Sequence, residues 1–218
     1  MYERHWRLSQ PAFRSCAPIE FFYPGRSHEA ALLKLHYLVE QRQGIAVLTG
    51  MSGIGKSCVL EAFCSQLPPT AGPVVNVLYP QLTSAELLGF LTTKLESTAG
   101  GSVDGHEGLD RVLQRLEQRF LALTEEGRHP VIIIADAHLI ADRRVFQTLQ
   151  LLLNYRRANR IEFSVVMAGQ PELVGQVKRY GALLDRLAFI STLTPFEEAE
   201  SLAYVRHRLS AAGGSAEI

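Results

Sequence analysis

The sequence has few of the features that mark disulfide-linked or metal-binding proteins. Its 218 residues include only three cysteines, at positions 16, 58 and 64, and these form no Cys-x-x-Cys pair. So small and odd a set is typical of reduced cytosolic thiols rather than of a disulfide framework. The seven histidines show no His-x-x-x-His or His-Glu-x-x-His spacing, so we expect no metal site built from histidines.

Long apolar runs and an excess of one charge are also absent. The start, MYERHWRLSQPAF, lacks the apolar run of a secretory signal. The longest apolar run, Val131–Ala135, is far shorter than the ~18 residues of a membrane helix. Lysine plus arginine (22) equals aspartate plus glutamate (22), so no overall basic charge indicates nucleic-acid binding. We therefore expect a cytoplasmic protein without a membrane span, in which DNA binding would require a local basic patch.

The remaining composition is that of a globular chain, with 47% hydrophobic and 20% charged residues. Short apolar or β-branched runs predict buried strands at 45–49, 74–79, 131–135 and 163–168. Helical spacing and capping patterns predict helices at 27–42, 56–67, 83–97, 109–127, 142–156 and 194–209. Strands that alternate with helices indicate one α/β domain, with a parallel sheet covered by helices on both faces.

Two capping patterns fix helix starts within this scheme. Thr83-x-x-Glu86 is a capping box that opens the helix over 83–97. Thr194-Pro195-x-Glu197 predicts an N-cap at Thr194, with proline at the first helical position. Between the central helices, the glycine-rich stretch 99–108 is the most loop-like part of the chain.

The clearest motif is Gly50-Met51-Ser52-Gly53-Ile54-Gly55-Lys56-Ser57, which fits Gly-x4-Gly-Lys-Ser/Thr at every fixed position. Its glycines allow a tight turn whose N–H groups hold an anion, and the following helix adds its N-terminal partial positive charge. Lys56 is expected to reach the β- and γ-phosphates of ATP, and the Ser57 hydroxyl to bind Mg²⁺. The predicted ATP-binding residues are Gly50, Ser52, Gly53, Ile54, Gly55, Lys56, Ser57 and Cys58.

ATP hydrolysis at such a loop also needs an acidic residue at the tip of a second buried strand. The candidate segment, VIIIADAH from Val131, has Ala135 where the first acid is usual and Asp136 where the second is usual. In one alternative Asp136 binds Mg²⁺, which requires a local twist because successive strand residues face opposite sides. In the other, Asp136 acts beside the attacking water while Ser57 and water hold Mg²⁺. Both predict slow hydrolysis and nearly normal ATP binding.

These motifs and several others resemble the ExeA/GspA-type AAA+ ATPases of general secretion, which lie close to the transposition ATPases TniB and TnsC. The resemblance rests on the phosphate loop and on Phe21–Pro24, VMAGQPEL at 166–173, LDRL at 184–187 and the stretch 193–213. It implies a P-loop NTPase of the AAA+ type that hydrolyses ATP with Mg²⁺ as an oligomeric motor or switch. It also implies a homo-oligomer and a secretion-type partner protein.

The resemblance implies a division of the chain as well. Residues 1–26 would form an arm packed on the core, residues 27–214 the AAA+ nucleotide-binding domain, and residues 215–218 a tail. The relatives continue through a helical lid with a Gly-x-Pro-Arg sensor, so the lid is expected to be missing or truncated here. The relatives' membrane span and peptidoglycan-binding region are expected to be missing too.

The same resemblance assigns roles to individual residues. Gln170 would be a polar sensor near the γ-phosphate or the attacking water, and Arg186 an arginine finger facing the nucleotide of a neighbouring subunit. With Asp136, these are the predicted catalytic residues. The arm at 22–24 would lie near the adenine, and the phosphate-loop strand would lie beside the strand that ends at Gly169.

Two other functions stay open. The alanine at position 135 also fits an interaction module that binds ATP without hydrolysing it. A TniB/TnsC-like, DNA-associated ATPase would fit the arginines at 111, 115 and 119, which lie on one face of a predicted helix. That spacing is more typical of a solvated helix face, and the balanced net charge argues against DNA.

Overall fold

The computed structural model describes residues 3, 8–14, 18–97 and 108–214. Cys16, the tail 215–218 and all of the predicted loop 99–108 except Gly108 lie outside the described residues. A five-stranded sheet forms the centre, in the order β2-β3-β4-β1-β5, and all neighbouring strands are parallel. Its strands are β1 (Ile45–Thr49), β2 (Ala71–Val77), β3 (His129–Ile134), β4 (Ser164–Gly169) and β5 (Leu187–Thr192).

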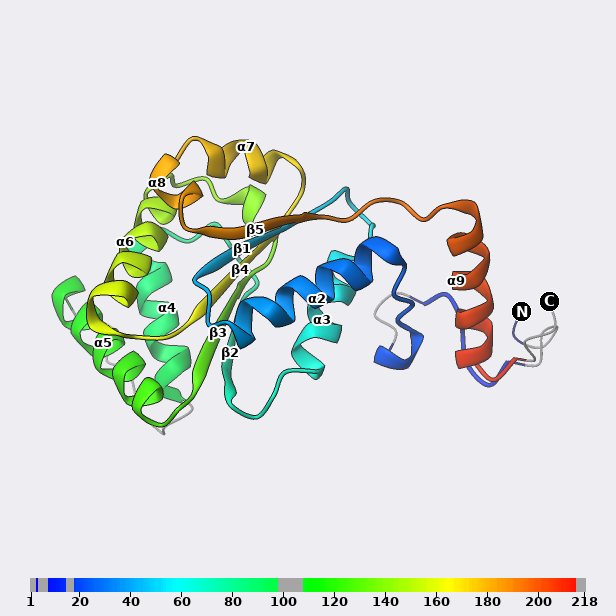
Figure 1. Cartoon of the computed structure of the whole chain (residues 1–218), viewed down its shortest axis with the longest axis horizontal. Helices are drawn as coiled ribbons and strands as arrows, with labels where there is room; N and C mark the ends of the chain where they lie inside the picture. The colour runs from blue at the N-terminus through cyan, green and yellow to red at the C-terminus, as the bar shows by residue number, and fades with distance from the viewer. Residues whose placement is uncertain (1–2, 4–7, 15–17, 98–107, 215–218) are drawn as a thin grey trace.

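Helices cover both faces of this sheet (Figure 1), as predicted. One face carries α2 (Arg26–Glu40) and α3 (Lys56–Ser65). The other carries α4 (Ser84–Ser97), α5 (Leu109–Glu125), α6 (Arg144–Asn159), α7 (Glu172–Lys178) and α8 (Gly181–Leu184). Both layers are needed because alternate strand residues point to opposite faces: Ile132 packs with α4 to α8, whereas Val131 packs with α2 and α3.

The two predicted helix starts have different outcomes. At α4, the Thr83 N–H donates to the Glu86 carboxylate (2.8 Å) and the Glu86 N–H donates to the Thr83 hydroxyl (3.3 Å), so the capping box is confirmed. The N-cap at Thr194 is wrong, because Glu197 precedes the first residue of α9 (Glu198–Ala211). The Thr194 N–H donates instead to the Ser27 hydroxyl (3.2 Å), which holds Thr194 against α2.

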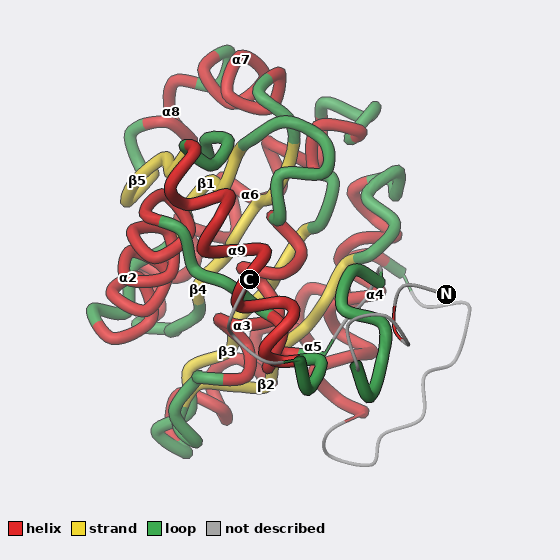
Figure 2. The backbone as a smooth tube through the Cα atoms, turned by 90° about the vertical axis from the view of Figure 1, so that its right-hand side faces the viewer, coloured by secondary structure: helices red, strands yellow, loops and turns green. Residues whose placement is uncertain are grey.

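The N-terminal segment packs against α9. Figure 1 shows α9 beside this segment at one end of the molecule, and Figure 2, turned by 90°, shows α9 standing in front of the helical layers. A small apolar cluster joins the two parts through Ala12, Phe21, Leu209 and Ala212. The Arg208 side chain, which is 9% exposed, donates to the carbonyls of Ala12 (2.5 Å) and Arg14 (3.1 Å). Residues of the short helix η1 (Ile19–Phe21) and of α9 line a pocket together with residues from the N-terminal half of α3. The η1–α9 wall therefore faces the start of α3.

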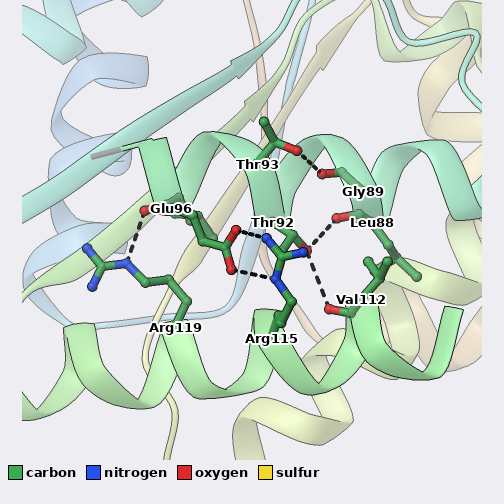
Figure 3. Close-up of polar contacts among 9 residues, drawn as sticks. Leu88, Gly89, Thr92, Thr93, Glu96, Val112, Arg115 and Arg119 are labelled. Carbon is green, nitrogen blue, oxygen red and sulfur yellow. Dashed lines mark hydrogen bonds and ion pairs between the residues drawn. The ribbon is translucent and has the colours of Figure 1, made fainter. Parts of the chain in front are cut away.

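The arginines on α5 link two helices (Figure 3). The Arg115 guanidinium bonds both carboxylate oxygens of Glu96 on α4, with Nε donating at 2.9 Å. The Arg119 Nε donates to the Leu95 carbonyl at 3.0 Å. Their side chains are only 25% and 15% exposed. The prediction of a solvated face is therefore wrong for these two residues, and neither is presented as a free cation to DNA.

Within the described ranges, no helix combines the length and the apolar character needed to cross a membrane.

Candidate nucleotide-binding site

The phosphate loop, residues 50–55, connects the carboxyl end of β1 to the N-terminus of α3. Gly53 and Gly55 have φ angles of +75° and +99°, a conformation that residues with a Cβ rarely adopt. The Gly50 N–H donates to the Gly169 carbonyl at 3.2 Å, which fastens the loop to the end of β4. The strand, tight turn and helix required by the motif are thus all present, and the loop opens at a helix N-terminus that favours anions.

Lys56, the first residue of α3, folds back over this loop. Its Nζ donates to the carbonyls of Gly50 and Met51, each at 2.8 Å. Burial lowers the pKa of this amine, and the nearby negative charge of Asp136 opposes that effect. Two neutral carbonyls thus hold the Lys56 amine at the loop, and phosphate oxygens could replace them with stronger, charge-assisted hydrogen bonds.

Asp136 lies just after the carboxyl end of β3, at the edge of the sheet where the phosphate loop follows β1. The Ala135 N–H donates to the Val77 carbonyl at 3.1 Å, which extends the β2–β3 pairing by one residue. The next residue, Asp136, has φ +46° and ψ +37°, so the strand geometry ends there in a left-handed turn. This turn is the local twist that Mg²⁺ binding by Asp136 would require, because it removes the strict alternation of side chains. The Asp136 side chain is exposed.

Gln170 follows β4 directly and is half-buried. Because β4 pairs with β1 in register, with Thr49 opposite Gly169, Gln170 follows the strand next to the phosphate loop. The residues after β3 are close as well, since a Cβ on Gly169 would lie 3.1 Å from the His138 backbone nitrogen. Lys56, Asp136 and Gln170 therefore lie at one edge of the sheet, where ligands of open α/β sheets bind.

A pocket of about 600 Å³ extends from the phosphate loop. Gly53, Ser57 and Cys58 line one side. The other side is aromatic, with Phe22 and Tyr23 from the arm, Phe196 from the loop before α9 and Tyr204 from α9. The Tyr23 and Phe196 rings meet edge to face with centroids 5.6 Å apart. The pocket therefore has an anion-binding end at the loop and an aromatic end of a kind that suits a planar ligand.

His28, which the sequence reasoning missed, connects these two ends. It is 3% exposed, its Nε2 lies 2.8 Å from the Ile54 carbonyl, and its ring centroid is 5.0 Å from that of Phe196. A carbonyl only accepts, so Nε2 carries the proton in this contact. His28 thereby fastens α2 to the phosphate loop. A histidine in the first turn of a predicted helix gives no signal of such a contact.

Comparison with known families agrees with this geometry. Residues 39–177 match the family described as the AAA domain, a span that includes the phosphate loop, Asp136 and Gln170. The chain belongs to the AAA family. It is also 30% identical over 216 residues to General secretion pathway protein A of Aeromonas hydrophila, covering 98% of this chain and 38% of that protein. The predicted resemblance to ExeA/GspA-type ATPases is thus confirmed, although the chain spans well under half of that relative's length.

Solved structures support the AAA fold at low sequence identity. The ORC2 protein of Aeropyrum pernix matches with a TM-score of 0.66 and 12% identity, over 90% of this chain and 56% of that one. Cdc6p from Pyrobaculum aerophilum matches with a TM-score of 0.63 and 15% identity, over 88% of this chain and 53% of that one. At these identities the matches establish the P-loop AAA+ fold alone.

Arg186 lies far from the other predicted catalytic residues of the AAA domain. It precedes β5, whose first residue Leu187 pairs with Ile45, the first residue of β1. It therefore lies at the amino edge of the sheet, about 15 Å from the phosphate-loop edge for a five-residue strand. Its guanidinium donates to the Asn154 side chain and to the Ala182 carbonyl. Within one chain, Arg186 is not part of the nucleotide site.

Proposed function

We propose that this AAA protein is an ATPase that acts as a homo-oligomeric switch or motor. The observation that carries the proposal is the pocket in which the glycine loop and the N-terminus of α3 face an aromatic wall, with the Lys56 amine bonded to the same loop. The triphosphate would bind the loop backbone over 50–58, and the Lys56 amine would exchange two carbonyls for β- and γ-phosphate oxygens. The adenine would lie against the wall that includes Tyr23 and Phe196.

The side chains at the phosphate end also fit Mg²⁺. Ser57 and Asp136 are both exposed there and supply the oxygen ligands that this ion prefers. When bound, Mg²⁺ would neutralise charge that develops on the phosphates. The Gln170 amide would orient the attacking water. Ala135 has no group that could assist either task, so we expect slow turnover.

The location of Arg186 supports action between copies of the chain. Because Arg186 is at the amino edge, it could reach phosphates only in another subunit. An oligomer in which Arg186 of one copy faces the nucleotide of the next would complete each site with a positive charge. A homo-oligomer of this kind is the simplest assembly that uses this residue.

The decisive measurement is steady-state ATPase activity against Mg²⁺ and protein concentration, for wild type, Lys56→Ala and Ala135→Asp. We expect Mg²⁺-dependent activity that rises more steeply than protein concentration, no activity in Lys56→Ala, and faster turnover in Ala135→Asp. Wild-type activity equal to that of Lys56→Ala at every concentration would rule out hydrolysis. Calorimetric titration with ATP and ADP tests binding independently.

Ala135 favours one second candidate, a module that binds ATP and changes its partner contacts without hydrolysis. If ATP binds with Mg²⁺ but neither wild type nor Ala135→Asp hydrolyses it, the result favours this second candidate over the ATPase. The name of the Aeromonas relative supports a partner protein in general secretion. A DNA-associated role is less favoured, because Arg115 and Arg119 are bonded to α4.

A further inference from the structure

One face of α3 forms a wall of the nucleotide pocket. Ser57, Cys58 and Glu61 are exposed on this face and line the pocket, whereas the buried residues of α3 are Val59, Leu60, Ala62 and Phe63. Glu61 follows Ser57 by four residues, so it lies about 6 Å further along the helix axis, away from the phosphate loop. The pocket wall therefore carries a hydroxyl at its phosphate end and a carboxylate one turn beyond.

Glu61 is the sole carboxylate among the described residues that line this pocket. It forms no ion pair or side-chain hydrogen bond with another described residue. Two arginines line the same pocket: Arg208 donates to the carbonyls of Ala12 and Arg14 and lies over the Phe21 ring at 5.1 Å, and the Arg14 guanidinium lies over that ring at 6.0 Å. The acceptor capacity of Glu61 is thus directed to the pocket rather than used within the protein.

The chemistry of a carboxylate selects among the parts of a nucleotide. An ionised carboxylate only accepts hydrogen bonds, so it would repel phosphates and needs a donor. The ribose is the first group beyond the phosphates, and its 2′- and 3′-hydroxyls are donors. The base end is served by the aromatic residues of the arm and α9.

We propose that Glu61 accepts a hydrogen bond from the 2′- or 3′-hydroxyl of the ribose and makes the site select ATP over the deoxy analogue that lacks that hydroxyl. This inference rests on the proposed nucleotide site and adds a specificity-determining residue to it. A hydrogen bond from a neutral hydroxyl to a carboxylate is charge-assisted, and its loss is expected to weaken binding about tenfold.

The test is calorimetric titration of the whole chain with Mg²⁺ and ATP, 2′-deoxy-ATP or 3′-deoxy-ATP. Labels on the ribose are avoided because they would block the group in question. Wild type should bind ATP about tenfold more tightly than at least one deoxy analogue. In Glu61→Ala this preference should disappear through weaker ATP binding, and in Glu61→Gln it should be intermediate because the amide oxygen still accepts.

Glu40→Ala is the matched control. Glu40 is exposed at the end of α2 and does not line the pocket, so this variant has the same charge change and should keep the wild-type preference. Alanine has the highest helix propensity and Glu61 is an exposed helical residue, so Glu61→Ala should keep the wild-type melting temperature.

Three results would overturn the inference. An unchanged ribose preference in Glu61→Ala shows that Glu61 does not bind the ribose. A change only in the ratio of ATP to inosine triphosphate, which lacks the adenine amine, shows that the carboxylate binds the base instead. Equal wild-type affinity for ATP and both deoxy analogues refutes the selectivity but leaves the proposed function intact, whereas no wild-type binding of any nucleotide contradicts both.

Discussion

The two edges of the sheet use polar residues in opposite ways. At the carboxyl edge, Lys56 is half-buried and Asp136 is exposed. At the amino edge, His129 is 3% exposed and its Nε2 lies 2.8 Å from the Ser164 hydroxyl, which donates to the Gln43 carbonyl at 2.5 Å. The polar groups named at the carboxyl edge are thus accessible to a ligand, while His129, Ser164 and Gln43 are linked by hydrogen bonds inside the protein. Substitutions at Lys56 or Asp136 should therefore change binding, whereas substitutions at His129 or Ser164 should change stability.

The largest expected effect is on ATPase activity, when a variant of the carboxyl edge is mixed with a variant of the amino edge. Lys56→Ala and Arg186→Ala should each abolish nearly all ATPase activity alone. If Arg186 acts on a neighbouring subunit, an equal mixture should recover about a quarter of wild-type activity, because random assembly joins an intact loop to an intact arginine at that share of interfaces. Initial rates after subunit exchange provide the measurement. Activity in Arg186→Ala alone that equals wild type would remove the arginine from the mechanism, and a mixture no better than its components would place its effect within one chain.

At the amino edge, Ser164→Ala should lower stability without changing nucleotide affinity. The substitution leaves the His129 ring and the Gln43 carbonyl without their shared partner in a buried site, at a cost of about 2 kcal/mol in the free energy of unfolding. Urea denaturation measures the loss, and ATP titration should give the wild-type Kd. Ser201→Ala, at an exposed position on α9, is the control and should change stability by less than about 0.5 kcal/mol. A loss no larger than in this control would show that the buried contact contributes little.

A smaller effect is expected on the pH dependence of folding stability. Burial and the positive charges of Arg156 and Arg42 lower the pKa of His129 to about 4, against 6.5 for the free side chain. Between these values the unfolded chain binds the proton and the folded protein does not, so stability falls as the pH decreases from 6.5 towards 4. The slope from this group is at most about 1.4 kcal/mol per pH unit.

His129→Gln should flatten that part of the stability curve. Glutamine can still bond Ser164 but does not titrate, so the comparison isolates the charge from the hydrogen bond. Denaturant titrations between pH 6.5 and 5 are suitable, because most carboxyl groups stay ionised there. Parallel curves for the two proteins would mean that His129 titrates normally in the folded state.

The sequence was most informative where a pattern reports local geometry. Ile45–Thr49 is predicted at its observed bounds because a buried parallel strand is a continuous apolar run. The phosphate loop and the Thr83–Glu86 capping box depend on backbone conformation within a few residues, so their residues alone reveal them. All these features could be identified without knowledge of tertiary contacts.

The features that the sequence did not reveal depend on distant partners. The outermost strand β5 is mostly half-exposed and lacks a continuous apolar run, so the sequence pattern does not predict a strand there. Nor does it predict α7 and α8, which have only seven and four residues. Helical spacing put Arg115 and Arg119 on one face but could not show that α4 covers it. His28 and Thr194 were misjudged for the same reason, since their partners Ile54 and Ser27 belong to other elements.

The pairing of the N-terminal segment with α9 has a consequence for biosynthesis. Residues 18–23 leave the ribosome early, but Phe196 and Tyr204, which share a pocket wall with them, are made about 180 residues later. A nascent chain can therefore contain the phosphate loop and the strands β1 to β4 before the aromatic wall is complete. Full affinity for nucleotide should therefore be acquired only after the segment that contains Phe196 and Tyr204 has been made.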